Sequence, residues 1–452
     1  MKSYEMNLTQ GSLFKNIFIY SVPLIFSNLL QVLFNIADVA VVGRFAGALP
    51  LGSVGSTSQL LFLYTGLIMG LGGGINVIVA FYIGAKNKKD LNDSLTASLF
   101  VSILTGVILM ILGLVTARPI LSAIKTKPEL LQGAVTYFSI YMLGLPGCTL
   151  YNFGNAVLSA AGDTKRPLYY LTAAGIVNII LNLFFVIVCR MDCAGVAIAS
   201  VISQYVSAIL VLNAVCRGIG DVKLDFAKLK RAKLNRTITI RILKIGIPSG
   251  LQNAIFAVAN TFVQMGINSF DAIMVAGTAA ASNLDPIVYN CMGAFYTACA
   301  SFIGQNYGAK NKKRIRDSYL VCTVYSFSFG LVIGLLLKYF GRPCLSLFTT
   351  DNSVIEAGML RMNIMGFSFC VASLMDNTIA ASRGLGKTLI PSIFVMIGSC
   401  VFRIAWIYTI FAWFQTIPSL FLLYIFSWFI TAVAEIIYFV WCFNHDTELA
   451  RI

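Results

Sequence analysis

The sequence predicts an all-α membrane protein with twelve transmembrane helices in two six-helix lobes. Of its 452 residues, 58% are hydrophobic and only 11% are charged, whereas about a quarter of the residues in a soluble domain are charged. Twelve apolar runs are long enough to cross a bilayer. The first half of the chain also resembles the second half in sequence.

The apolar runs give the order of the expected helices. A run of about 20 residues spans the hydrocarbon core as a helix. Strands of a transmembrane barrel would alternate with period two, and no such alternation occurs. The first run lacks a small-residue cleavage site, so we expect a retained span rather than a signal peptide. The runs cover roughly 16–42, 52–82, 94–116, 131–160, 168–189, 193–215, 239–268, 273–305, 318–340, 355–382, 390–411 and 419–443.

An internal repeat divides the chain into halves. The stretch GAKNKKDLNDSL, Gly84–Leu95, recurs as GAKNKKRIRDSY, Gly308–Tyr319, with eight of twelve positions identical. The segment GDTKRP at 162–167 matches GKTLIP at 386–391 with the same offset of 224 residues. A duplication of one six-helix unit explains both matches.

The repeat predicts the domain organisation. We expect an N-terminal lobe over 1–216, a basic cytoplasmic linker over 217–241 and a C-terminal lobe over 242–452. Because six is an even number, both lobes enter the membrane in the same sense. A pseudo-two-fold axis along the membrane normal would then relate them, with a substrate site between them.

The distribution of the basic residues explains the formal net charge of +15 by membrane topology. With both termini cytoplasmic, the cytoplasmic side holds 24 Lys and Arg residues, the other side holds eight, including Arg361, and Arg403 lies within a span. This is the positive-inside bias, so we expect no nucleic-acid partner. The eleven cysteines contain no CxxC pair, which argues against disulfides and a zinc site.

Polar side chains inside the first span indicate a functional face. Asn28, Gln31, Asn35 and Asp38 are spaced 3, 4 and 3 residues apart, so they share one face of a helix. Such a face points into protein or a water-filled cavity. Hydrogen bonding between helices is the alternative. The seventh span repeats part of this face, with Val263 in place of the acid, in the residues Asn253, Asn260 and Gln264.

Spans 5 and 6 add further oxygen ligands. Asn178 and Asn182 lie one helical turn apart, and Ser200 follows in the next span. Together with Asp38 they suit a hard cation such as Na⁺, or a proton carried by the buried carboxyl group. The second-half matches of Asn178 and Asn182 are Phe402 and Trp406. We therefore expect Asp38 and Asn182 to converge, and Val263, Phe402 and Trp406 to form an apolar or aromatic cluster that cannot hold an ion.

The second half carries its own acids. Asp285 and Asp376 can attract a cationic substrate, or they can form a salt bridge with Arg403. Glu435 is interpreted as structural. The GLGGG segment at 70–74 lacks the Lys-Ser/Thr of a phosphate loop and indicates close helix packing. The expected substrate-binding residues are Gln31, Asn35, Tyr151, Asn152, Asn260, Asp285 and Asp376.

Five segments carry a resemblance to a known family: SVPLIFSNLLQVLFNIADVAVVG, IGAKN, AAGDTKRP, GVAIASVISQ and IGQNYGAKN. They resemble the bacterial branch of the multidrug and toxic compound extrusion (MATE) transporters. The resemblance covers essentially the whole chain. It implies two lobes around a central cavity and export of organic cations in exchange for H⁺ or Na⁺.

The resemblance also implies a cation site, because Asp38, Asn178, Asn182 and Ser200 fall where the family places one. This chain departs at Asn182 and Ser200, where other members can carry Asp and Thr. It also lacks the family's Glu in span 7, while an acid in span 10, here Asp376, is a family feature. With a single carboxylate we favour H⁺ over Na⁺.

The leading hypothesis is therefore a secondary multidrug antiporter in the cell membrane. We expect it to act as a monomer, to be no enzyme, to need no cofactor and to exchange drugs or organic cations for H⁺ or Na⁺. The alternative is a flippase for a lipid-linked precursor, whose anionic head group would need a cavity lined by Arg and Lys. A passive channel is a third reading, but the sequence has neither a charged ring nor a carbonyl filter.

Overall fold

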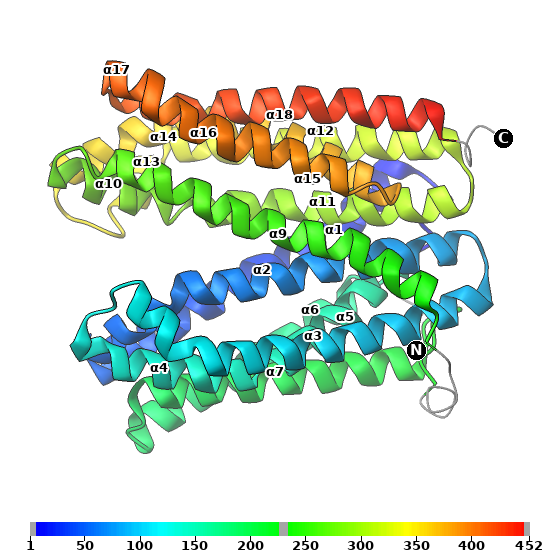
Figure 1. Ribbon diagram of the computed structural model, residues 1–452, viewed down its shortest axis with the longest axis horizontal. Coiled ribbons are helices and arrows are strands. Elements are labelled where there is room, and N and C mark those ends of the chain that lie inside the picture. Colours follow the sequence, from blue (N-terminus) through cyan, green and yellow to red (C-terminus); the bar gives the residue numbers. More distant parts are fainter. Residues whose placement is uncertain (1–5, 226–233, 447–452) are drawn as a thin grey trace. The chain divides into compact units, whose positions relative to one another are not determined.

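A computed structural model describes residues 6–225 and 234–446, and it is helical as the sequence predicts. Residues 226–233 of the predicted linker and Arg451 lie outside the described residues. Figure 1 labels the helices along the chain. In the first half they are α1 Leu13–Val41, η1 Val42–Ala46, α2 Ala48–Gly84, α3 Lys88–Ala123, α4 Pro128–Leu143, α5 Leu145–Ala160, α6 Lys165–Leu183, η2 Phe184–Val188 and α7 Asp192–Arg217.

The second half repeats this order with more interruptions. Segments labelled η are π-helical. The helices are α9 Arg236–Ile267, α10 Ala272–Ser282, α11 Asp285–Gly308, α12 Lys312–Tyr339, α13 Gly341–Leu345, α14 Asn352–Gly384, α15 Leu389–Val395, η3 Met396–Val401, α16 Phe402–Trp406, η4 Ile407–Phe411, α17 Ala412–Phe414 and α18 Ile417–His445.

Eleven helical segments in the described ranges are long and apolar enough to span a membrane, and one of them, Ala272–Gly308, contains a turn between α10 and α11. The fourth predicted span, 131–160, is instead broken into α4 and α5, of 16 residues each, at Gly144. The break has a local cause, because Pro146 stands in the first turn of α5 and cannot donate a backbone hydrogen bond. The two short helices together cover the length of one span.

The chain divides into two compact units that do not follow the predicted sequence halves. Unit 1 contains Phe26–Gly250 with the residues up to Asn7, and unit 2 contains Leu8–Ile25 and Leu251–Ile452. The first part of α1 therefore belongs to unit 2, and the first part of α9 belongs to unit 1. We retain 1–216 and 242–452 as the proposed limits of the two repeats.

Specific contacts explain why the start of α1 belongs to unit 2. The Tyr20 hydroxyl donates to Ser301 Oγ at 2.8 Å, and the Tyr20 ring packs edge-on against Phe302. The backbone oxygen of Leu8 accepts hydrogen bonds from Asn306 and Arg314. Buried hydrogen bonds thus fix the chain before α1 enters unit 1.

The repeated GAKN motif builds the same turn twice. Lys86 and Lys310 both adopt left-handed backbone conformations, with φ of 54° and 56°. The next residue caps a helix in each copy, because Asn87 accepts from the Asp90 amide and Asn311 accepts from the Arg314 amide. The repeat therefore conserves a helix connection as well as a basic charge.

The glycines of GLGGG allow close helix packing within unit 1, as predicted. A Cβ atom on Gly70 would meet the backbone of Gly250, and one on Gly74 would meet the backbone of α9 at Ile242 and Gly246. Backbone atoms cannot yield as the end of a flexible side chain can. Helices α2 and α9 therefore pack at a distance that only glycine permits.

We expect Gly70→Ala to destabilise the protein by about 1–3 kcal/mol, because the added methyl group forces the two helices apart. Thermal unfolding of the purified protein in detergent measures the effect. Gly55→Ala is the matched control, since Gly55 is in the same helix and its Cβ would meet nothing within 4 Å. Equal melting temperatures for both variants would contradict the packing argument.

Candidate functional site

Unit 1 brings together Asp38 and the three polar residues predicted to accompany it. Asn182 Nδ2 donates to Asp38 Oδ1 at 2.5 Å, and Ser200 Oγ donates to Asp38 Oδ2 at 3.3 Å. Asn182 Nδ2 also donates to Asn178 Oδ1 at 3.1 Å, and Asn178 Nδ2 donates to Ser200 Oγ at 3.5 Å. The four side chains form a closed ring of hydrogen bonds from helices α1, α6 and α7.

Three of the four ring side chains are buried, and the Asp38 side chain is half-buried. Asn182 is 0% exposed, and Asn178 and Ser200 are 5% exposed each. Asp38 is its only acid, and no three His, Cys, Asp or Glu side chains gather to hold a metal ion in the described part of the chain. The side-chain oxygen of Asn182 is buried without a hydrogen-bond donor. A buried oxygen without a donor is suited to a cation.

Two helix irregularities adjoin this ring. The π-helical segment η1 begins four residues after Asp38, and η2 begins two residues after Asn182. Single π-helical turns occur frequently at functional sites. The helical backbone is therefore irregular within about one turn of Asp38 and of Asn182.

The other predicted residues of unit 1 do not join the ring. Asn35 is exposed and Gln31 is half-buried, and neither makes a hydrogen bond to the described residues. Asn152 donates to the Cys148 carbonyl of its own helix at 2.9 Å, and Tyr151 is buried beside it. The structure leaves their predicted contact with substrate untested.

In unit 2 the predicted salt bridges to Arg403 are absent. Asp285 instead pairs with Arg361, with Nη1 to Oδ1 at 3.1 Å and Nη2 to Oδ2 at 2.5 Å. Asp376 is half-buried and makes no hydrogen bond or ion pair with a described residue. The positive charge that acts on it electrostatically is that of Arg383. The alternative in which these acids pair with Arg403 was therefore wrong.

Arg361, which the sequence analysis assigned to the non-cytoplasmic end of a span without a partner, is the cation that pairs with Asp285. Its side chain is buried, and its guanidinium lies over the Phe421 ring at 5.4 Å. Because Arg361 falls inside the apolar run 355–382, its position already indicated a need for a buried acidic partner. Glu435 is fully buried, and neither of its carboxyl oxygens has a partner among the described residues.

The second-half matches of the ring are apolar, as predicted. Val263 and Trp406 belong to one hydrophobic cluster of unit 2, and the Phe402 and Trp406 rings lie 5.6 Å apart. This cluster offers no ligands for a cation.

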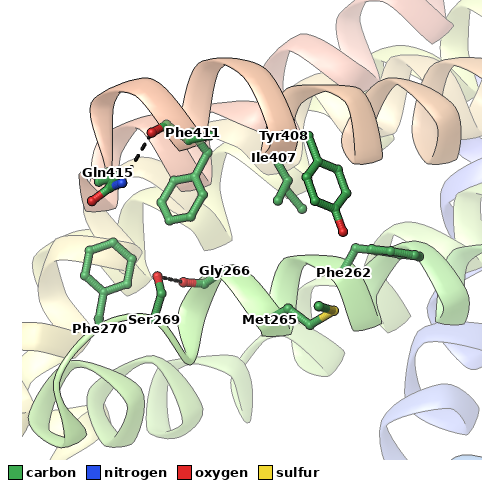
Figure 2. Close-up of a pocket in the computed structure, with 10 residues that line it drawn as sticks. Phe262, Met265, Gly266, Ser269, Phe270, Ile407, Tyr408, Phe411 and Gln415 are labelled. Atoms are coloured by element: carbon green, nitrogen blue, oxygen red, sulfur yellow. Dashed lines mark hydrogen bonds between the residues drawn. The ribbon is translucent and has the colours of Figure 1, made fainter.

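A separate cavity of about 340 Å³ opens between α9 and the η4–α17 segment of unit 2. Figure 2 shows its mainly apolar lining, with Phe270 and Gln415 near one end and Phe262 and Tyr408 near the other. Its polar groups include Ser269, whose hydroxyl donates to the Gly266 carbonyl at 2.7 Å. Nothing in the sequence analysis pointed to this cavity.

A helical membrane protein of two compact units, with polar groups buried inside its spans, has the features of a secondary transporter. The MatE family model matches residues 23–184 and 248–409, once in each half. These two matches cover more than half of the chain. The chain therefore belongs to the MatE family, whose members are transporters and not enzymes.

Individual relatives agree with this assignment. The probable multidrug resistance protein YpnP of Bacillus subtilis is 28% identical over 371 residues, which cover 82% of this chain and 81% of that protein. An FAD transporter of Shewanella oneidensis is 25% identical over 327 residues, 72% of either chain. A solved structure described as the outward-facing conformation of a multidrug resistance MATE transporter superposes with a TM-score of 0.89 over 98% of both chains, at 21% identity. This last match shows the fold alone.

The pair of the half-buried Asp285 with the buried Arg361 gives a stability prediction. Replacing Arg361 with Met leaves the half-buried carboxylate without its partner, which we expect to cost up to about 3–5 kcal/mol. The double variant Asp285→Asn, Arg361→Met should recover part of that loss. Thermal unfolding in detergent measures all variants.

The exposed pair Arg342–Glu356 of the same unit is the matched control. Arg342→Met should cost at most about 1 kcal/mol, because water already solvates both partners. If Arg361→Met lost as little stability as Arg342→Met, the Asp285–Arg361 pair would stabilise the protein no more than an exposed ion pair.

Proposed function

We propose that this protein is a secondary multidrug exporter that exchanges drugs or organic cations for a cation bound at Asp38. The observation that supports the proposal is the hydrogen-bonded ring of Asp38, Asn178, Asn182 and Ser200, in which all but Asp38 are buried. Placing an ionisable residue inside a span costs free energy, so such a residue usually marks a functional site. Here it joins three helices of unit 1.

The coupling follows from the charge of one carboxyl group. When Asp38 is ionised, it attracts the Asn182 amide and the Ser200 hydroxyl, which hold α6 and α7 against the end of α1. A bound proton or metal cation neutralises this charge and changes those bonds. The cation can then drive export, provided that cation and substrate stabilise different conformations.

We favour H⁺ over Na⁺ as the coupling ion, because the ring contains a single carboxylate. A sodium ion needs several oxygen ligands, and Asp38, Asn178, Asn182 and Ser200 would supply them after their amides turn. A proton needs only the Asp38 carboxylate. The hydrogen bonds of the ring already point N–H and O–H groups at Asp38, which leaves few oxygens free for a metal cation.

For the substrate, we propose contacts with Gln31, Asn35, Tyr151 and Asn152 of unit 1 and with Asn260 and Asp376 of unit 2. Asp376 is the acid best suited to a cationic drug, since it has no hydrogen-bonded partner among the described residues. Asp285 is already neutralised by Arg361, so we no longer favour it. We further propose a monomer in the cell membrane with both termini cytoplasmic.

The first test replaces Asp38 with Asn, which keeps the size of the side chain and removes its charge. Ion-driven efflux of ethidium from proteoliposomes should fall by about tenfold or more, the range of typical coupling energies. Size-exclusion chromatography checks that the variant stays folded. Glu129→Gln, at an exposed site of unit 1, is the control and should pump normally.

Normal ion-driven efflux by a folded Asp38→Asn variant would overturn the coupling site and move it to Asp376. The transporter assignment does not depend on this result, because it rests on the family match.

A second test separates H⁺ from Na⁺. With pH and Na⁺ gradients imposed separately, the pH gradient alone should drive ethidium efflux by the native protein. Asn182→Asp adds a second carboxylate beside Asp38 and should make efflux respond to Na⁺, because paired carboxylates favour a metal cation. Efflux by the native protein that follows only the Na⁺ gradient would reverse our choice of ion.

A further inference from the structure

Arg403 is a buried positive charge within a predicted span of unit 2. It lies in α16, within the apolar segment Leu389–Phe414, and is 2% exposed. No acidic side chain pairs with it among the described residues, and the groups that act on it electrostatically are Tyr424, Tyr289 and Cys400. A guanidinium stays charged at any physiological pH, so this site lacks a counter-charge.

The neutral partners of Arg403 leave hydrogen-bond donors unused. Nε donates to Ser427 Oγ at 3.3 Å, and Nη1 donates to Asn260 Oδ1 at 3.1 Å. Nη2 donates to no described group, and this atom is not fully buried. The Asn260 amide, on an exposed side chain, likewise donates to no described group. Two donors from different helices thus remain available beside one positive charge.

The two acids nearest this site do not neutralise Arg403. Asp285 forms two hydrogen bonds with Arg361 and so neutralises that residue. Asp376 acts electrostatically on Tyr289, beside Arg403, but it forms no ion pair with Arg403. The Arg403 guanidinium therefore has no paired acid among the described residues.

Aromatic rings surround this charge. The Arg403 guanidinium carbon lies 4.5 Å from the centre of the Tyr424 ring and 5.8 Å from those of Phe256 and Trp428. Ring faces stabilise a guanidinium without neutralising it. They also offer flat surfaces to a planar molecule that approaches the charge.

Arg403 occupies the place in the second repeat that the acid ring occupies in the first. It directly follows Phe402, the match of Asn178, and Tyr424 comes 224 residues after Ser200. The parallel extends to the backbone, because η3 and η4 flank α16 just as η1 and η2 adjoin the Asp38 ring. In the described chain, all four π-helical segments adjoin one of these two charged sites.

We propose that Arg403 and Asn260 bind the anionic group, a carboxylate or a phosphate, of an aromatic molecule that this protein transports. Guanidinium groups recognise both anions through paired hydrogen bonds. Nη2 and the Asn260 amide supply the donors, and Tyr424 and its neighbouring rings supply the stacking surface. This substrate class goes beyond the organic cations proposed above and does not depend on coupling at Asp38.

Flavin mononucleotide (FMN) and riboflavin are a matched pair of probes, because they share an aromatic ring system and differ by a phosphate. Calorimetric titration of the purified full-length protein in detergent compares their affinities. FMN should bind at least about tenfold more tightly than riboflavin, a difference typical of a charge-assisted hydrogen-bonded pair. Inorganic phosphate, which lacks the ring, should bind more weakly than FMN.

Variants locate the effect. Arg403→Gln should abolish the preference for FMN, and Arg403→Lys should retain part of it. Arg342→Gln removes an exposed positive charge from the same unit and should change nothing. Asn260→Ala alters an exposed side chain and should weaken the binding of FMN several-fold. This variant provides a test even if Arg403→Gln does not fold.

Equal affinity of the native protein for FMN and riboflavin would overturn the proposal, as would an undiminished FMN preference in folded Arg403→Gln or Asn260→Ala. Displacement of FMN by phosphatidylglycerol at equal concentration would assign the site to a lipid head group instead, which also overturns it. Asp38→Asn should keep the FMN preference. A failure of the coupling proposal is thereby distinguished from a failure of this one.

Discussion

The hydrocarbon core contains no water, so a polar side chain inside a span is costly unless it finds a partner within the protein. Many hydroxyl groups in the spans find one locally, as Thr116 and Thr172 do by donating to carbonyls one turn earlier in their own helices. Charged groups have no such local solution. Asp38 and Asp285 are held by side chains from other helices, and these bonds tie together segments that are far apart in sequence.

The sequence predicted the parts of the structure that depend on local patterns. Apolar length defined the spans, and the spacing of Asn178, Asn182 and Asp38 placed them on polar helical faces that meet in the structure. The break at Gly144 was missed, because hydropathy continues across it. The partner of Asp285 was also missed, since the choice between Arg361 and Arg403 depends on how α11, α14 and α16 pack.

The two units show how a duplicated fold can acquire different chemistry. Both copies keep the GAKN turn, with Asn87 and Asn311 as helix caps. The buried polar sites have diverged, because unit 1 presents the carboxylate of Asp38 and unit 2 presents the guanidinium of Arg403. The repeated sequence therefore preserves how the helices connect, while single substitutions inside the spans set the sign of the local charge.

The π-helical turns beside these sites have a mechanical consequence. Each such turn holds one residue more than an α-helical turn, and one residue of an α-helix corresponds to about 100° of rotation and 1.5 Å of rise. If the π-helical turn of η2 moved toward the start of α6, the residues that it passed would rotate about the helix axis. The Asn182 amide would then turn away from Asp38, while α6 would shift little along its axis. Helices of this design can exchange their buried faces by turning in place, while their ends stay at the same depth in the bilayer.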